Sequence, residues 1–178
     1  WNMPRLGTFN LHASLLPQYR GAAPINWAII NGDKETGATT FFLTHEIDTG
    51  KIIMQKRIPI ADNDNAGTVH DRLMVMGASM VTETVDVILD GRVSPVDQES
   101  VNVNEPLRPA PKIFKETCRI DWNKSAKDIF NFIRGLSPYP AAWCEWEAPD
   151  QTVYTVKIFE TEVINTTNEK PGTLYTDG

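Results

Sequence analysis

The chain has 178 residues, of which 41% are hydrophobic and 22% charged, a composition typical of a globular protein that can bury a core. Its formal net charge of -6 argues against attraction of the whole chain to nucleic acid, so an RNA contact would need a local patch. Two cysteines are too few for a disulfide framework, and no apolar run approaches the roughly 20 residues of a membrane helix. We therefore expect a cytoplasmic protein that does not enter the membrane.

The first predicted element is a short strand over residues 8–12. Because side chains alternate along a strand, Phe9 and Leu11 should lie on one face, and Asn10 and His12 on the other. The loop that follows contains a proline and a glycine, at positions 17 and 21, which should fix its path.

A helix is predicted to begin at Pro24, which suits the first turn, and to end at the Asn-Gly pair of residues 31–32. Two β-rich segments follow, over residues 39–44 and 51–60. They flank the sequence Glu-Ile-Asp-Thr-Gly at positions 46–50. This arrangement predicts an antiparallel hairpin with a functional turn.

A long helix is predicted over residues 69–89, with capping residues at 64–68. Its apolar residues recur at helical spacing, and we expect this methionine-rich stripe to pack in the core: Leu73, Met76, Met80, Val81, Val85 and Ile88. The helical spacing of apolar residues then ends, and the sequence becomes rich in Pro, Asn, Glu and Asp. This composition predicts a linker over residues 94–111.

The last third of the chain reads as one short helix and several strands. The helix is predicted over residues 125–136, and the strands over 141–147, 153–163 and 173–175. Strands at this spacing suit the opening of a small β-barrel.

The start of the chain, Trp-Asn-Met-Pro, is not a natural one, and only a few residues separate it from Asn10. Doubly wound α/β enzymes place functional residues at the carboxyl end of a strand, and other strands of the sheet precede that strand in the sequence. We therefore expect the chain to be an internal piece of a longer protein that lacks the amino-terminal part.

Three side chains could together move a one-carbon acyl group onto an amine. Asn10 could donate an N–H to the carbonyl oxygen that becomes negative, and His12 could donate a second hydrogen bond and return a proton to the leaving nitrogen. Asp48 beside the imidazole would favour its charged form and could accept the amine proton.

The run Asn-Leu-His-Ala-Ser-Leu-Leu-Pro-Gln-Tyr-Arg-Gly-Ala-Ala-Pro over residues 10–24, with Asp-Thr-Gly at 48–50, resembles the signature of the folate-dependent formyltransferases. The resemblance implies that Asn10, His12 and Asp48 form a catalytic trio, that the co-substrate is 10-formyltetrahydrofolate, and that no metal is needed. It also implies an α/β fold: the C-terminal half of a doubly wound formyltransferase domain, followed by the start of a small OB-like β-barrel domain. The corresponding ranges are 1–93 for the catalytic domain, 94–111 for the linker and 112–178 for the barrel domain.

The same resemblance assigns the loop Ser14, Leu15, Leu16 and Pro17 to folate binding, although a rigid loop that only holds His12 is an alternative. Arg20 is a candidate for substrate binding through a phosphate or carboxylate, with a solvated side chain as the alternative. We expect the other two histidines, His45 and His70, to be surface or structural residues.

The acceptor is suggested by three segments, over residues 20–24, 112–122 and 137–143. They resemble the branch of the family that formylates methionyl initiator tRNA. The alternatives are a formyltetrahydrofolate hydrolase or dehydrogenase domain, which the Ile-Asn-Trp sequence at 25–27 resembles, and a sugar-nucleotide formyltransferase. We expect a monomer.

An alternative of another class is that the isolated piece is inert, or at most a weak RNA-binding module. Four aromatic residues could stack on RNA bases, but we expect them to pack in the core of the second domain: Phe132, Tyr139, Trp143 and Trp146. A basic cluster could face RNA or be a solvated face: Lys112, Lys115, Arg119, Lys124 and Lys127.

Overall fold

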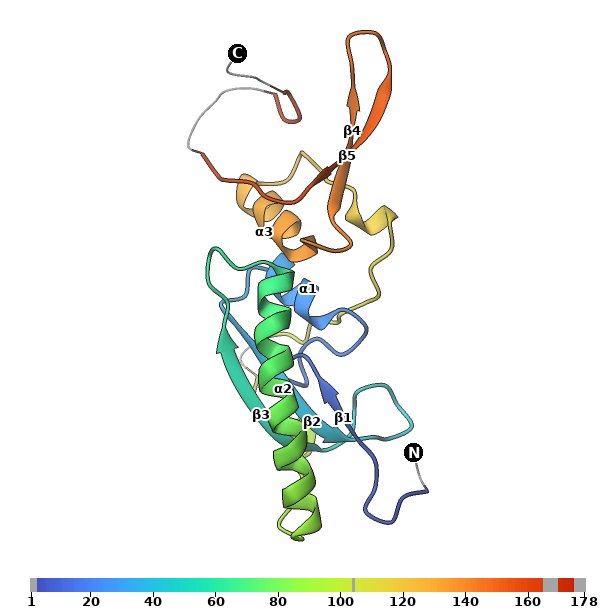
Figure 1. Cartoon of the computed structure of the whole chain (residues 1–178), viewed down its shortest axis with the longest axis vertical. Coiled ribbons are helices and arrows are strands. Elements are labelled where there is room, and N and C mark those ends of the chain that lie inside the picture. The colour runs from blue at the N-terminus through green and yellow to red at the C-terminus, as the bar shows by residue number, and fades with distance from the viewer. Residues whose placement is uncertain (1–2, 104, 165–169, 175–178) are drawn as a thin grey trace.

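The computed structural model describes residues 3–103, 105–164 and 170–174. Within them the chain forms an elongated molecule, with a sheet crossed by a long helix at one end and a β-hairpin projecting from the other (Figure 1). The strands and helices, in chain order, are β1 (Phe9–His12), α1 (Pro24–Ile30), β2 (Glu35–Phe42), β3 (Ile52–Pro59), α2 (Ala66–Leu89), α3 (Ala126–Leu136), β4 (Ala142–Glu147) and β5 (Val153–Ile158).

The first part of the chain is built on a three-stranded sheet in the order β1-β2-β3. Both strand pairs are antiparallel, so the predicted hairpin is confirmed, with β2 beginning earlier than expected, at Glu35. The described strands of this sheet thus include no parallel pair of the kind that a doubly wound domain contains. The helices and strands together make an α/β fold, in which these three strands form an antiparallel section.

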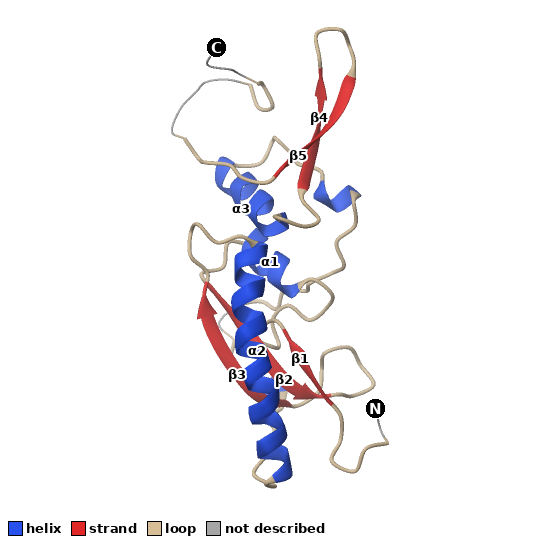
Figure 2. Cartoon of the chain, viewed as in Figure 1, coloured by secondary structure: helices blue, strands red, loops and turns tan. Residues whose placement is uncertain are grey.

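Helix α2 covers one face of this sheet (Figure 2). It begins with a reciprocal capping box, in which the Asn65 side chain accepts from the Thr68 N–H while the Thr68 hydroxyl accepts from the Asn65 N–H. The predicted stripe is confirmed for Leu73 and Met80, which are buried, whereas Val85 is 39% exposed, because at this level the face that meets the sheet is the one that carries the buried Thr84.

The helix and the sheet are also joined by a buried polar contact. The hydroxyls of Thr40 on β2 and Thr84 on α2 are 2.9 Å apart, and neither residue is exposed. We expect Thr84→Val to destabilise the fold by about 1–3 kcal/mol, because it leaves the Thr40 hydroxyl buried with a partner lost. The double change Thr40→Val with Thr84→Val should recover most of that loss, as measured by urea unfolding. Equal and additive losses in the two single variants would contradict this expectation.

Helices α1 and α3 bring the two parts of the chain together. Asn26 on α1 donates to the Gly135 carbonyl at 2.8 Å, and a Cβ on Gly135 would lie 2.6 Å from the Ile30 side chain. The buried Arg134 guanidinium donates to the carbonyls of Ala61 and Asp64, just before α2. No helix among the described residues is both long enough and apolar enough to cross a membrane.

The hairpin β4–β5 extends from this junction and is the second sheet within the described residues. A closed barrel is not seen in the described part of the chain. Strand β5 ends at Ile158, short of the predicted 163. Thr173 and Leu174 are not in a strand, and Tyr175 lies outside the described residues.

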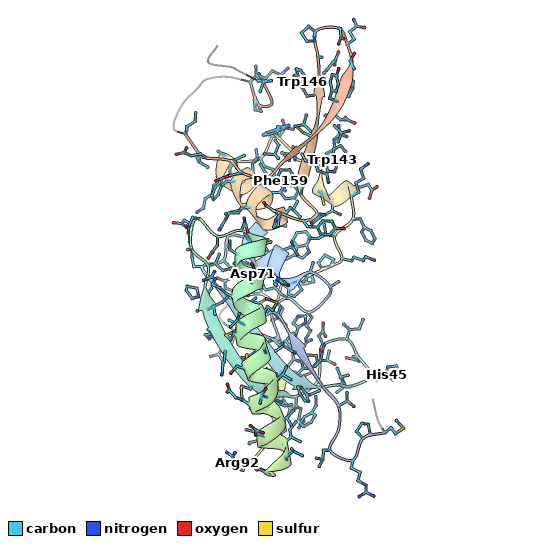
Figure 3. The ribbon with its side chains drawn as sticks, viewed as in Figure 1. His45, Asp71, Arg92, Trp143, Trp146 and Phe159 are labelled. Atoms are coloured by element: carbon cyan, nitrogen blue, oxygen red, sulfur yellow. The ribbon has the colours of Figure 1, made fainter. Side chains whose placement is uncertain are left out.

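The expectation that the aromatic residues of this part pack in its core is wrong for two of them. Tyr139 is 82% exposed, and Trp146 is 41% exposed and stacks on Tyr154 in the projecting hairpin (Figure 3). Phe132 packs against the buried cluster around Ile133, and so does Trp143.

Candidate active site

Asn10 and His12 lie on the face of the sheet opposite α2. The intervening residue, Leu11, packs against the core beneath α2, where a Cβ on Gly77 would lie 2.6 Å from it. The alternation predicted for this strand therefore holds. Asn10 is exposed, whereas His12 is only 6% exposed and meets the edge of the Phe41 ring.

The imidazole of His12 faces an oxygen at each nitrogen. Nε2 is 2.8 Å from the Tyr19 carbonyl oxygen, which can only accept, so this nitrogen carries a proton. Nδ1 is 3.7 Å from Oδ2 of Asp48. This distance is longer than a hydrogen bond, so Nδ1 has room to contact a third oxygen.

Asp48 lies in the connection between β2 and β3, in a left-handed backbone conformation with φ of 55°. Its Oδ2 accepts the Gly21 N–H at 3.0 Å. The carboxylate is thus fixed by the main chain of the loop after β1, and the side chain is only 12% exposed. The structure brings His12 and Asp48 together and places Asn10 two residues away on the same face of β1.

Tyr19 holds its carbonyl toward His12 from a strained position, because its φ is 60°. The side chain is nearly buried, and its hydroxyl donates to Asp33 at 2.7 Å. Burial, and then the hydrogen bond with Asp33, raise the pKa of the Tyr19 phenol, so it remains a hydrogen-bond donor. Arg108 donates to the same hydroxyl and to Asp33.

The loop predicted to bind folate is mostly buried. Ser14 and Leu16 have 0% and 1% exposure, and Thr39 bonds both through its hydroxyl, which donates to the Ser14 carbonyl and accepts the Leu16 N–H. Leu15 and Leu16 contribute to the wall of a cavity of about 560 Å³ that extends toward Arg57. The residues lining this cavity do not include Asn10, His12 or Asp48.

Arg20, predicted to bind substrate, is engaged within the protein. Its Nε and Nη2 donate to Oε1 of Gln98 at 3.0 and 2.7 Å. Gln98 was not singled out by the sequence, because it lies in the segment predicted to be a linker. A lone glutamine in a polar, proline-rich stretch carries no signal that distinguishes it from its neighbours.

The remaining histidines are exposed, as expected. His45 lies on the connection that also carries Asp48 (Figure 3), and His70 lies on α2. Within residues 3–103, 105–164 and 170–174 there is no group of three or more His, Cys, Asp or Glu side chains that could hold a metal ion. The basic residues Lys115 and Arg119 lie over the Trp143 ring, and Arg119 also pairs with Glu145.

The His12 imidazole lies beside the carboxylate of Asp48, and the Asn10 amide lies on the same face of β1. In an α/β fold these three groups form a candidate acyl-transfer site. Residues 1–85 match the family described as formyl transferase, and residues 112–178 match the family described as formyl transferase, C-terminal domain. The chain belongs to the formyl transferase family.

Curated relatives match along the whole chain. A methionyl-tRNA formyltransferase of Bacteroides thetaiotaomicron is 66% identical over 179 residues, covering 100% of this chain and 56% of the relative. One from Phocaeicola vulgatus is 68% identical over 179 residues, covering 99% of this chain and 55% of the relative. The chain thus spans about half the length of these relatives.

Solved structures show the same fold at lower identity. An N-formyltransferase from Helicobacter canadensis, in complex with folinic acid and dTDP-3-aminofucose, is 27% identical with a TM-score of 0.60, covering 71% of this chain and 46% of that one. A candidate sugar N-formyltransferase from Mycobacterium tuberculosis is 26% identical with a TM-score of 0.68, covering 92% of this chain and 66% of that one.

Proposed function

We propose that this chain is part of an enzyme that transfers the formyl group of 10-formyltetrahydrofolate to the α-amino group of methionyl initiator tRNA. The observation that carries the proposal is the fixed pair His12 and Asp48, 3.7 Å apart, beside Asn10 on the open face of β1. The acceptor is proposed from the relatives, which are named methionyl-tRNA formyltransferases at 63–68% identity.

The proposed chemistry begins when the neutral amine attacks the formyl carbon and a C–N bond forms. The carbonyl oxygen becomes negative, and the Asn10 amide with the Nδ1–H of His12 would donate to it. A well-placed donor of this kind contributes about 3 kcal/mol. Asp48 would accept the proton that the amine loses, directly or through a water molecule. The bond to the folate nitrogen then breaks, and that nitrogen takes up a proton from His12.

A folate co-substrate is supported by the Helicobacter canadensis neighbour, which is named as a complex with folinic acid. The loop of Ser14, Leu15, Leu16 and Pro17 remains our candidate for part of that contact. Because Ser14 and Leu16 are buried, we propose that they act by shaping the loop and that its main chain and Leu15 face the ligand.

The domain division is part of the same proposal: a catalytic region over 1–93, a linking segment over 94–111 and the start of an OB-like barrel over 112–178. It is supported by the two family matches, which end at 85 and begin at 112, and by the hairpin β4–β5. We further propose that the enzyme is a cytoplasmic monomer.

The test is an acceptor assay in which the chain is completed with the remaining sequence of its Bacteroides thetaiotaomicron relative. Formyl transfer from 10-formyltetrahydrofolate is measured to methionyl-tRNA, to an amino-sugar nucleotide and to water, with uncharged tRNA as the control. We expect formylmethionyl-tRNA as the product. Transfer only to the sugar or to water would overturn the proposed acceptor. The chain of residues 1–178 alone should show little turnover, and measurable turnover would contradict that expectation.

A further inference from the structure

A buried glutamine joins the two loops that carry the candidate site. Gln98 is 4% exposed and lies in a short 3-10 turn, Gln98–Ser100, well beyond α2 in the sequence. Its Oε1 accepts two N–H groups of Arg20, and its Nε2 donates to the carbonyl oxygens of Asp48 and Gly50, each at 2.8 Å. The side-chain amide of Gln98 thus uses all of its hydrogen-bonding capacity.

The partners also fix which way the amide of Gln98 points. The guanidinium of Arg20 can only donate, and main-chain carbonyls can only accept, so the oxygen must face Arg20 and the nitrogen must face the Asp48 turn. A glutamate at this position would keep the contact with Arg20 but would set an oxygen against two carbonyl oxygens. The surroundings of residue 98 therefore favour an amide over a carboxylate of the same shape.

Gln98 is itself held firmly on both sides. Val96 forms an antiparallel bridge with Ile52, with two hydrogen bonds of 2.8 Å, and Asp97 pairs with Lys51. On the other side, Val101 packs against the buried cluster that includes Ile52. Residues 96–101 are therefore fixed beside the turn that carries Asp48.

The loop on the other side of Gln98 makes three contacts from three consecutive residues. The Tyr19 carbonyl holds His12, the Arg20 side chain holds Gln98, and the Gly21 N–H holds the Asp48 carboxylate. Gln98 closes this arrangement, because it connects Arg20 to the main chain of the Asp48 turn. Among the polar contacts of the described residues, the bond from Gly21 and the contact between His12 and Asp48 are the others that join this loop and β1 to the Asp48 turn.

We infer that Gln98 is a positioning residue that sets the distance between Asp48 and His12. For its kinetic consequence this inference rests on the proposed function. Gln98 has no role in proton transfer, since its polar atoms are all engaged away from the imidazole. Its effect on the reaction should come through the placement of Asp48, and a misplacement of about 1 Å can cost roughly a hundredfold in rate.

The test compares Gln98→Glu with Gln98→Leu, and uses Glu99→Gln, on the exposed side of the same turn, as the matched control. Hydrogen exchange of the Gly21 amide is followed by NMR in the chain of residues 1–178. This amide reports its bond to Asp48 whether or not the chain is active. We expect exchange at Gly21 to be at least about tenfold faster in both Gln98 variants than in the control, with exchange at Ile52 and Val96 unchanged.

The kinetic readout uses the completed enzyme of the acceptor assay. Gln98→Glu should lower kcat by about ten- to a hundredfold with little change in KM for either substrate. Unchanged Gly21 exchange in both variants would overturn the inference, and so would faster exchange of all three amides together, which would indicate general loosening of the fold. If the completed enzyme formylates none of the acceptors, the proposed function fails while the exchange result still decides the role of Gln98.

Discussion

Replacing Asp48 with Asn is expected to lower kcat for formyl transfer by about a hundredfold or more. In the unaltered chain the Gly21 nitrogen lies 3.0 Å from Oδ2 of Asp48. The asparagine keeps an oxygen that can accept this N–H, so the turn should hold its shape. The negative charge beside His12 is lost, and with it the group proposed to take the amine proton. Steady-state kinetics of the completed enzyme with methionyl-tRNA would measure the change, and KM for the tRNA should stay within a few fold.

The matched control for this variant is Glu46→Gln, which removes a negative charge from the same connection at an exposed position. It should retain nearly all activity, because charges in water are screened. A loss of less than about tenfold in Asp48→Asn would exclude Asp48 from the proton transfer. A similar loss in both variants would instead indicate a general electrostatic effect of the loop.

Replacing Gly50 with Ala should be the most damaging single change for the site region as a folded structure. A Cβ at this position would lie 1.6 Å from the Phe42 carbonyl oxygen and 2.8 Å from its carbon. This main chain cannot move aside easily, because the Phe42 N–H is paired with Lys51. We expect a loss of about 3 kcal/mol or more, since overpacking against backbone forces the strands apart.

Thermal unfolding followed by circular dichroism would measure the Gly50→Ala effect, with an expected fall in Tm of roughly 6–12 °C for that loss. Gly91→Ala is the control, because a Cβ there meets no atom within 4 Å although φ is +66°. That variant should lose only about 1–2 kcal/mol from the left-handed backbone. Equal stability of the two variants would mean that the β2–β3 turn is more adaptable than its geometry indicates.

Much of the local structure could be predicted from the sequence because the signals are local. Pro24 begins α1, Asn65 caps α2, and α3 occupies the range predicted for it, with Ser125 as its cap. The β-rich segments on either side of Asp48 form the expected antiparallel hairpin. In each case a residue type has a physical preference for the position it occupies.

The contacts that complete the site could not be predicted in this way. Gln98 is 78 residues from Arg20 and 50 from Asp48, and a hydrogen bond across that separation leaves no pattern in either segment. The contact of Arg20 with the buried Gln98 could not be predicted for the same reason. The exposure of Tyr139 and Trp146 was missed because aromatic residues usually pack inside, whereas Tyr139 lies in the turn after α3 and Trp146 on the hairpin β4–β5.

The three consecutive contacts of Tyr19, Arg20 and Gly21 have an evolutionary consequence. Two of them are made by the main chain, so the bonds to His12 and Asp48 do not depend on the identity of a side chain. The Tyr19 side chain is constrained separately, because its buried hydroxyl is bonded to Asp33 and Arg108. Position 21 should not tolerate a side chain, because its φ is +129° and a Cβ would lie 2.3 Å from the Ala110 carbonyl oxygen. At the two main-chain contacts, selection should act on the shape of the backbone more than on side-chain chemistry.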